Sequence, residues 1–246
     1  MQTLGALSIV IPLYNEEENV EATVRDIHAK IGPRAANYEI LLVDDGSHDK
    51  TAGLVDRLAA SDARVRAVHH PRNLGYGAAL RSGFAAARHP LIFYTDGDLQ
   101  FDLSEIDRLV PLLDGADIVT GYRINRQDPW HRRFNAGFYN LVMRTLFGVK
   151  QRDLDCAFKF YRKSIFDVVA IESDSILVSG EIMVQAVRHG LVIREAGVTH
   201  YPRARGVPTG NKPLVVVAAM LELARFCWRQ LSLRRTQRNQ VGKGSR

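Results

Sequence analysis

Short apolar runs alternate with helix-like segments through the first two thirds of the chain, and this order constrains the fold more than any other feature. The apolar runs predict strands at residues 7–12, 38–43, 65–68, 91–95 and 117–120. The segments between them predict helices at residues 15–31, 51–60 and 76–88, and a further helix capped by Ser104. Asn15 and Glu18 have the spacing of a capping box. Apolar strands between amphipathic helices indicate an α/β fold, with a mostly parallel sheet covered on both faces.

The pattern changes after Gly121. Later elements are expected as a helix at 130–147, a helix near 181–189, a strand near 191–198 and a helix at 213–231. Residues 200–212 contain too many Pro and Gly residues for regular structure, and loops of this length usually carry function or are disordered. We therefore divide the chain into an α/β domain at 1–212, an amphipathic helix at 213–231 and a basic, flexible tail at 232–246.

The predicted helix at 213–231 determines how the chain could associate with a membrane. It contains Glu222, Arg225 and Arg229, so it is a poor spanning segment. Its apolar residues share one face beside basic side chains, and two alternatives stay open: it lies in a membrane interface, or it packs on the domain.

The positive charge of the chain is concentrated at its C-terminal end. Six basic and no acidic residues lie between Arg229 and Arg246, and they equal the formal net charge of +6. Such a tail is a solvated end, a contact for nucleic acid or an anchor to anionic lipid.

The cysteines and the N-terminus bear on the compartment. Cys156 and Cys227 are far apart, which gives no disulfide framework and no metal-binding pair and favours a reducing setting. The N-terminus lacks the basic and then apolar order of a secretion signal. We expect a cytoplasmic protein, bound to the cytosolic face of a membrane peripherally or through a separate membrane protein. The oligomeric state stays open.

Two carboxylates directly follow the apolar run at 91–95. Asp96 and Asp98, separated by Gly97, stand at the C-terminal end of the expected strand. Open α/β sheets bind their ligands at this edge. Oxygen donors this close together suit a hard divalent cation that keeps positions open for phosphates, and Gln100 adds a third oxygen. The sequence therefore predicts a metal site formed by Asp96, Asp98 and Gln100.

Polar residues also follow the first two expected strands. Pro12 and Tyr14 can hold the face of a nucleobase, and Glu16 can accept a hydrogen bond from its edge. Asp44 or Asp45 can bind base or ribose hydroxyls. Each motif alone also has a plain structural explanation, as a helix cap or a turn. Their common position at one sheet edge favours a nucleotide site.

A glycine-rich segment at 73–83 follows the third expected strand. Its glycines, Gly75 among them, allow close approach of another backbone. Their spacing differs from G-x-G-x-x-G, which disfavours a dinucleotide fingerprint.

Taken together, the four motifs resemble glycosyltransferase family 2, and within it the dolichyl-phosphate mannose synthase-like branch of polyprenyl-phosphate sugar synthases. The motifs are Val-Ile-Pro-Leu-Tyr-Asn-Glu, Val-Asp-Asp-Gly-Ser-His-Asp-Lys-Thr, Asn-Leu-Gly-Tyr-Gly-Ala-Ala-Leu and Asp-Gly-Asp-Leu-Gln. The resemblance implies a GT-A fold, a nucleotide-diphosphate sugar donor and Mg²⁺ or Mn²⁺. It implies donor contacts from Pro12, Tyr14, Glu16, Asp44, Asp45, Gly75, Asp96, Gly97 and Asp98, with Asp98 as a direct metal ligand.

The resemblance extends to basic residues later in the chain. Arg123 and Arg126 resemble residues that this branch places near phosphates, and an anionic acceptor requires such positive charge. Arg203, Arg205 and Lys212 fall where the family has a mobile acceptor loop.

The segment from 153 to 159 is similar to the family pattern D-x-x-S-G-F-R. Cys156, Ala157 and Lys159 replace the serine, glycine and arginine of that pattern.

We expect a single inverting displacement at the anomeric carbon of the sugar. A polyprenyl phosphate acceptor is largely ionised at neutral pH and needs no strong base. A sugar hydroxyl acceptor would need one, and Asp153, Asp155 and Glu181 are the candidates. Glu181 can instead orient a hydroxyl of the donor sugar or lie on a helix surface. The candidate catalytic residues are therefore Asp98, Arg123, Asp153, Asp155 and Glu181.

Three functions remain as interpretations. The first is transfer of a sugar to a polyprenyl phosphate, and the second is transfer to a glycan or a small molecule by the same class of enzyme. The third is a non-catalytic module that binds a nucleotide sugar or nucleic acid. No aromatic residues are interleaved with the arginines of the tail at 232–246, so nucleic acid is not expected as a partner.

Overall fold

The computed structural model describes residues 4–124, 130–202 and 222–228. The chain divides into two compact units, Met1–Gly206 and Val207–Arg246. In the second unit residues 222–228 are helical, and the rest of the predicted helix and tail lies outside the described residues. Arg126, Arg203, Arg205 and Lys212 also lie outside them. Among the described helices, none combines the length and the apolar character needed to cross a membrane.

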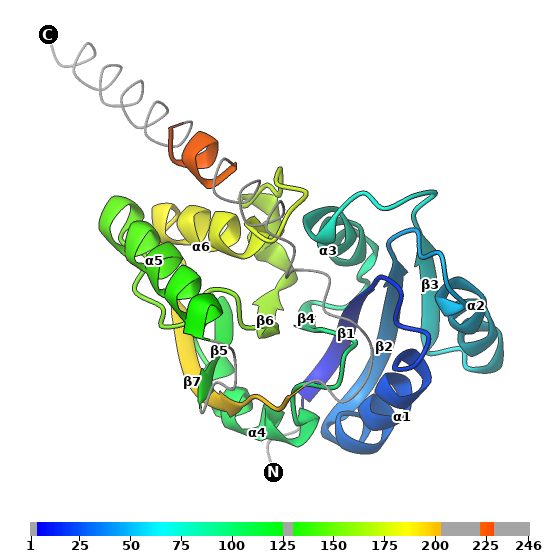
Figure 1. The fold of residues 1–246 in the computed structure, drawn as a ribbon. Helices are drawn as coiled ribbons and strands as arrows, with labels where there is room; N and C mark the ends of the chain where they lie inside the picture. The colour runs from blue at the N-terminus through cyan, green and yellow to red at the C-terminus, as the bar shows by residue number, and fades with distance from the viewer. Residues whose placement is uncertain (1–3, 125–129, 203–221, 229–246) are drawn as a thin grey trace, which may run out of the picture. The chain divides into compact units, whose positions relative to one another are not determined.

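The first unit is built on one twisted sheet, with the strands in the order β3-β2-β1-β4-β6-β5-β7 among the described residues (Figure 1). The strands are β1 (Leu4–Leu13), β2 (Ala35–Asp44), β3 (Val65–His69), β4 (Leu91–Thr95), β5 (Ile118–Ile124), β6 (Phe158–Arg162) and β7 (Ile193–Thr199). The α-helices are α1 (Val20–Lys30), α2 (Thr51–Ser61), α3 (Tyr76–Ala86), α4 (Ile106–Leu109), α5 (Trp130–Phe147) and α6 (Val178–Arg188). The 3₁₀ helices are η1 (Gly32–Arg34), η2 (Leu103–Glu105), η3 (Val110–Leu113) and η4 (Lys163–Asp167).

The connections place helices on both faces of the sheet. The chain moves outward from β1 to β2 and β3 through α1 and α2, then returns through α3 to β4 beside β1. Because crossovers between parallel strands are right-handed, this reversal puts α3 on the face opposite α1 and α2. Gly83 of α3 lets the helix approach Val10 and Val43 of the sheet closely. The expected α/β architecture is confirmed.

Strand β6 lies where the sequence predicted only a motif. It pairs antiparallel with β4 on one side and with β5 on the other, whereas β1, β2, β3 and β4 pair in parallel, as do β5 and β7. The sheet is therefore mostly parallel, as expected, with one antiparallel strand between β4 and β5.

The capping box predicted for the first helix is wrong. Helix α1 begins at Val20, and Asn15 has a φ of 55°, a left-handed conformation that cannot begin a helix. The backbone N–H of Asn15 donates to Ser47 Oγ (2.9 Å), and its side-chain Oδ1 accepts from the N–H of His48 (2.8 Å). Asn15 thus ties the loop after β1 to the loop after β2 instead of capping a helix.

The helix predicted from Ser104 is broken into η2, α4 and η3. Asp102, and not Ser104, supplies the cap, because its carboxylate accepts from the N–H of Ser104 at 3.0 Å. Pro111 stands at the start of η3, where it has no N–H to continue the α-helical hydrogen bonds.

Candidate active site

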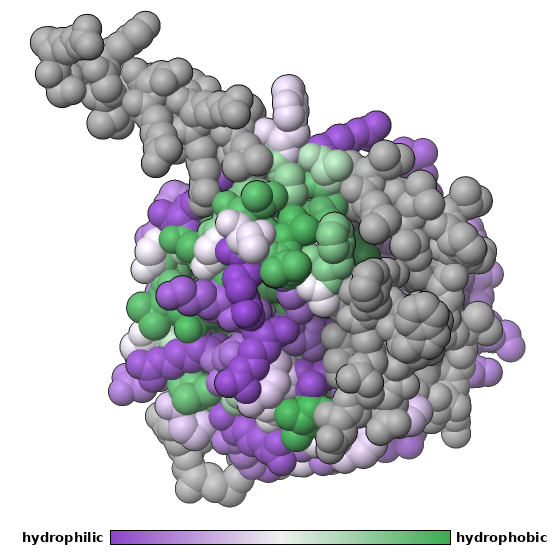
Figure 2. Space-filling view, turned by 60° about the vertical axis from the view of Figure 1, so that its left-hand side comes forward, coloured by the Kyte–Doolittle hydropathy of each residue, from purple (hydrophilic) through white to green (hydrophobic). Residues whose placement is uncertain are grey.

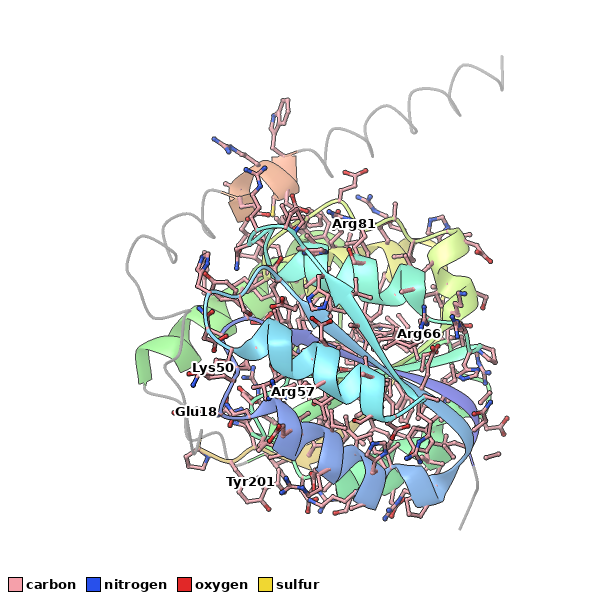
Figure 3. All side chains as sticks on the ribbon, turned by 90° about the vertical axis from the view of Figure 1, so that its right-hand side faces the viewer. Glu18, Lys50, Arg57, Arg66, Arg81 and Tyr201 are labelled. Carbon is pink, nitrogen blue, oxygen red and sulfur yellow. The ribbon has the colours of Figure 1, made fainter. Side chains whose placement is uncertain are left out.

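Strands β1, β2, β3, β4 and β5 run in one direction and end at the same edge of the sheet. Figure 3 shows Glu18, Lys50 and Tyr201 along this edge and Arg66 at the opposite one. The structure therefore brings all four sequence motifs to one edge, as their order in the chain predicted.

Asp96 and Asp98 follow the last residue of β4. Both are half-buried. Gly97 between them is buried against Leu13 of β1, which leaves no room for a side chain at this position. Tyr76, the first residue of α3, donates from its hydroxyl to Asp96 Oδ1 (2.8 Å) and lies 3.0 Å from the hydroxyl of Tyr94. Tyr76 was not among the predicted site residues, since only the fold brings it to Asp96.

Burial and the neighbouring carboxylate of Asp98 raise the pKa of Asp96 to about 7. The hydrogen bond from Tyr76 and the charges of Lys159 and Arg123 oppose this shift but do not cancel it. Two carboxylates that repel each other across a short distance are a favourable place for a cation.

The raised pKa predicts how the metal-free protein responds to pH. The folded state holds the Asp96 proton more tightly than the unfolded state, so the free energy of unfolding should fall as the pH rises from about 4 to about 7. In EDTA, Asp96→Asn should remove about 1–3 kcal/mol of this fall, measured by urea unfolding at pH 5 and pH 8. The exposed carboxyl of Asp114 gives the control, Asp114→Asn. Parallel pH curves for wild type and Asp96→Asn would contradict the prediction.

Gln100, the third predicted metal ligand, faces the segment after β7. Its side-chain Nε2 donates to the backbone carbonyl of Tyr201 (2.9 Å), and the backbone carbonyl of Gln100 accepts from the N–H of Tyr201 (2.8 Å). Gln100 therefore joins the Asp96–Asp98 loop to the start of the predicted acceptor loop, and its role as a metal ligand stays a prediction.

Asp44 and Asp45 lie at the end of β2 and are buried, at 2% and 3% exposure. Asp44 accepts from the N–H of Ser47 (3.1 Å) and contacts His69 Nδ1 (3.1 Å). Asp45 contacts His70 Nδ1 (2.6 Å). Neither histidine was predicted as a site residue, and they hold the two carboxylates from β3 and from the loop after it.

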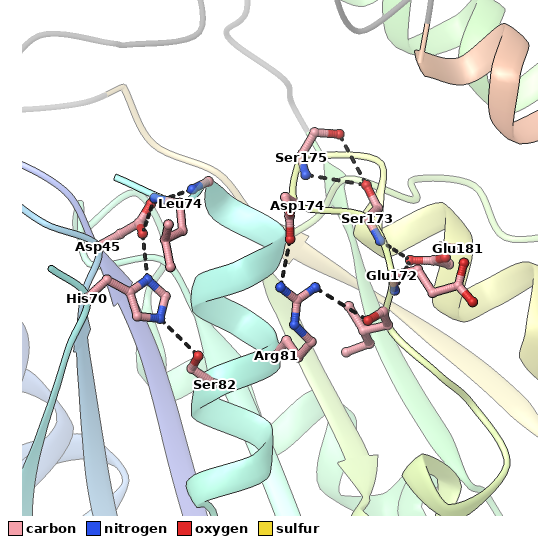
Figure 4. A network of polar contacts seen from close by, with 12 residues as sticks. Asp45, His70, Leu74, Arg81, Ser82, Glu172, Ser173, Asp174, Ser175 and Glu181 are labelled. Carbon is pink, nitrogen blue, oxygen red and sulfur yellow. Dashed lines mark hydrogen bonds and ion pairs between the residues drawn. The ribbon is translucent and has the colours of Figure 1, made fainter. Parts of the chain in front are cut away.

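Both carboxylate oxygens of Asp45 extend this network to the start of helix α3 (Figure 4). Asp45 accepts from the backbone N–H groups of Leu74 and Gly75, both at 2.9 Å. Gly75 has a φ of 102°, which favours glycine, and a side chain there would overlap the carbonyl of Asp174. The predicted nucleotide residues Asp45 and Gly75 are thus part of one rigid turn.

Glu181 is buried at 1% exposure and is not on the helix surface. Its Oε2 accepts from the backbone N–H groups of Glu172 (3.0 Å) and Ser173 (2.9 Å), as Figure 4 shows. In the same loop the carbonyl of Asp174 accepts from the N–H of Gly77 (2.9 Å). Glu181 therefore holds the loop that packs against the start of α3.

Gly77 packs tightly against this loop, as Gly75 does, and this close contact gives a testable prediction. A Cβ on Gly77 would overlap the carbonyl oxygen of Ser173, so Gly77→Ala should lower the free energy of unfolding by about 1–3 kcal/mol. Gly53 lies in the first turn of α2 with only Arg57 within 4 Å, and Gly53→Ala should be neutral or stabilising. Urea unfolding of both variants measures the difference, and equal effects would argue against a close α3 contact.

The predicted base-binding residues lie at the end of β1. Pro12 is buried in the strand, and Tyr14 is half-buried with its ring edge-on to His48 at 6.2 Å. The N–H of Glu16 donates to Thr51 Oγ1 (2.8 Å), and its Oε2 accepts from Asn19 (2.7 Å). The loops after β1 and β2 thus form one platform.

Arg123 and Asp153 face each other near the end of β5. Arg123 donates from Nε to Asp153 Oδ2 (2.6 Å) and from Nη2 to Oδ1 (2.8 Å), with the side chains 12% and 7% exposed. Burial alone would lower the pKa of Arg123, but the bonds and charge of Asp153 raise it above its usual range. Asp155, the third candidate base, is half-buried two residues further on.

Lys159 is a fully buried lysine beneath the site. It is paired in register with Tyr94 on β4, and its Nζ lies 5.5 Å from the centre of the Tyr94 ring. Nζ donates to the carbonyls of Leu154 (2.9 Å) and Cys156. Burial lowers the pKa of Lys159 and raises that of the Cys156 thiol to about 12, so Cys156 is not a reactive thiol. Lys159 shapes the turn that carries Asp153 and Asp155.

The donor set at Asp96 and Asp98 fits a hard divalent cation. Both side chains offer carboxylate oxygens, and their mutual repulsion would be relieved by a cation. Within the part of the chain that the structure describes, no group of three or more His, Cys, Asp or Glu residues is arranged to hold a metal ion. A cation here would therefore rely on water or phosphate oxygens to complete its coordination.

The chain belongs to glycosyl transferase family 2, whose model matches residues 8–170. It is 41% identical over 168 residues to the undecaprenyl-phosphate 4-deoxy-4-formamido-L-arabinose transferase of Pseudomonas fluorescens (strain SBW25), covering 68% of this chain and 49% of that protein. It is 37% identical over 165 residues to the transferase of the same name from Aeromonas hydrophila subsp. hydrophila, covering 66% and 51%. The chain thus spans about half the length of these relatives.

Solved structures show the same GT-A fold. The glucosyl-3-phosphoglycerate synthase of Mycobacterium tuberculosis in complex with phosphoglyceric acid superposes with a TM-score of 0.71 at 19% identity, covering 90% of this chain and 80% of that one. The same protein in complex with Mn²⁺ and UDP-glucose gives a TM-score of 0.69 at 18% identity, covering 90% and 79%. At these identities the likeness establishes the fold alone.

Proposed function

We propose that this chain is a metal-dependent inverting glycosyltransferase that moves a sugar from a nucleotide-diphosphate donor to a polyprenyl phosphate. The observation that carries the proposal is the convergence of Asp96 and Asp98 with the loops after β1, β2 and β3 at one sheet edge. The names of the curated relatives, undecaprenyl-phosphate sugar transferases, support the polyprenyl acceptor.

The protein's own residues would divide the work of binding the donor. The platform of Tyr14 and Glu16 would hold the base, while the turn fixed by Asp45 would bring the N-terminal end of α3 toward the donor. Asp96 and Asp98 would hold Mg²⁺ or Mn²⁺, which when bound supplies a Lewis acid for the leaving diphosphate. Gln100 would link donor binding to the start of the acceptor loop.

The partners of two of the three candidate bases, Asp153 and Glu181, favour a phosphate acceptor over a hydroxyl. Asp153 accepts from Nε and Nη2 of Arg123, and Glu181 accepts from two backbone N–H groups. A carboxylate acting as a general base would have to give up these hydrogen bonds. A phosphate monoester is already ionised at neutral pH and attacks without a base. Arg123 lies at the same edge, and exchange of its Asp153 partner for an acceptor phosphate would place its positive charge on the substrate.

A polyprenyl phosphate lies in a membrane, so the protein would have to contact the membrane surface to bind it. Figure 2 shows apolar side chains gathered on the side of the first unit where α5 and α6 lie. Phe138, Leu141 and Leu146 of α5 are between 37% and 57% exposed. We propose that the protein binds peripherally at the cytosolic face of a membrane, with this side as one contact.

The proposal is tested first by donor binding and then by transfer. Thermal shifts with UDP- and GDP-sugars, each with Mn²⁺, should identify a donor that raises the melting temperature, because ligands that bind the native state stabilise it. Transfer of radiolabelled sugar from that donor should then be compared for polyprenyl phosphate and an oligosaccharide. Donor binding without transfer to either acceptor would contradict the enzymatic function.

A further inference from the structure

A cavity lies at the edge of the sheet opposite Asp96. Its volume is about 750 Å³, and it is lined by the C-terminal half of α3, by η4 and by the residues that follow η4. Pro90 lines it immediately before β4 begins, whereas Asp96 follows the end of that strand. At about 3.3 Å per residue the two positions are about 20 Å apart, so the cavity is separate from the candidate active site.

The floor of this cavity is apolar and partly aromatic. The rings of Phe84 and Phe166 stack with their centres 4.9 Å apart and an angle of 23° between their planes. Val169 and Ile171 continue the apolar lining. Phe84 is buried at 3% exposure, whereas Phe166 and Ile171 are half-buried, so the ring of Phe166 and the side chain of Ile171 form the apolar surface that a ligand would contact. The volume is that of a site for a small molecule.

The rim of the cavity is strongly basic. Arg81, Arg88, Arg162 and Lys163 line it together with one acidic residue, Asp167. Arg81 is paired with Asp174 outside the lining at 2.7 Å, which leaves a net positive charge around the opening.

Neutral partners hold two of these cations in place. Arg162 donates to the carbonyls of Ala116 and Leu113, both at 2.8 Å, and Lys163 donates to the carbonyl of Ala87 at 2.7 Å. Carbonyls order a side chain without cancelling its charge. A ligand would therefore meet cations that are already positioned. Binding would cost less conformational entropy, because these side chains are ordered beforehand.

We propose that this cavity is a binding site for a small amphipathic anion, with an aromatic or apolar body against Phe166 and Ile171 and one acidic group at the Arg88 and Lys163 rim. This site is independent of the proposed sugar transfer, because none of its lining residues belongs to the donor or acceptor site. The cations select an anion, and the ring of Phe166 selects a flat apolar body.

The test uses anilinonaphthalene sulfonate as an anionic aromatic probe and its uncharged parent, phenylnaphthylamine, for comparison. Fluorescence titration of the folded full chain should show that the anionic probe binds about tenfold more tightly than the parent. Ala85→Glu, which places a carboxylate on an exposed lining position of α3, should weaken the anionic probe about tenfold. Arg88→Ala, a second variant at an exposed position, should weaken it several-fold and leave the parent unchanged.

Matched variants on α2 separate this site from general surface charge. Ala60→Glu and Arg57→Ala change exposed residues of the same types and should leave the titration of the anionic probe unchanged. Equal affinity of the anionic probe for wild type, Ala85→Glu and Arg88→Ala would overturn the proposal. So would loss of probe binding as the chain dimerises at higher concentration, since a second copy would then occupy the cavity.

Discussion

Asp98→Asn should lower sugar transfer by on the order of a thousandfold, with the fold intact. The change keeps the size of the side chain and removes the negative charge that would hold a divalent cation beside Asp96. It also relieves the repulsion that raises the pKa of Asp96, so the metal-free variant should be at least as stable as wild type. Radiolabel transfer measures activity, and the melting temperature with and without Mn²⁺ measures metal binding.

Asp102→Asn provides a control on the same loop. Asp102 caps η2 and pairs with Lys30 at 3.0 Å, so its loss should affect stability while transfer stays within a few-fold of wild type. If Asp98→Asn kept both its transfer rate and its Mn²⁺-dependent rise in melting temperature, the metal site would have to lie elsewhere.

The sequence predicted the parts of the fold that depend on local pattern. Alternation of apolar runs and amphipathic helices defined β1 to β4 and the helices between them, because each of these elements is encoded by its own periodicity. Strand β6 was not predicted because its five residues follow a polar turn and include a lysine. Lys159 can be buried because its Nζ donates to the carbonyls of Leu154 and Cys156, contacts that the sequence pattern does not indicate.

The sequence predicted the positions of the motif residues in the candidate site, but not of the residues that support them. Asp96 and Asp98 lie at the end of β4 as expected, and Asp45 lies with Gly75 in one turn. The supporting residues could not be read from spacing. Tyr76 reaches Asp96 from another helix, as His70 reaches Asp45 from another loop, and neither residue type signals such a contact on its own.

Asp153→Asn should destabilise the protein by about 3–5 kcal/mol, because it leaves the guanidinium of Arg123 buried without its counter-charge. The free energy of unfolding from urea titration measures this effect, and single-turnover transfer measures the chemical step. If Asp153 were instead a general base, its amide variant would lose transfer while the free energy of unfolding stayed close to that of wild type.

Glu195→Gln is the matched control for this pair. It removes the carboxylate partner of Arg152, whose side chain is 64% exposed, from an ion pair of 3.1 Å. Solvent screens such a pair, so the loss of stability should be below about 1 kcal/mol. A large effect at Asp153 and a small one at Glu195 would follow from burial alone, since both variants remove one carboxylate charge from an arginine. Equal effects would mean that water reaches the Arg123–Asp153 pair as freely as the exposed one, and Arg123 would then be available to bind an acceptor phosphate without first leaving Asp153.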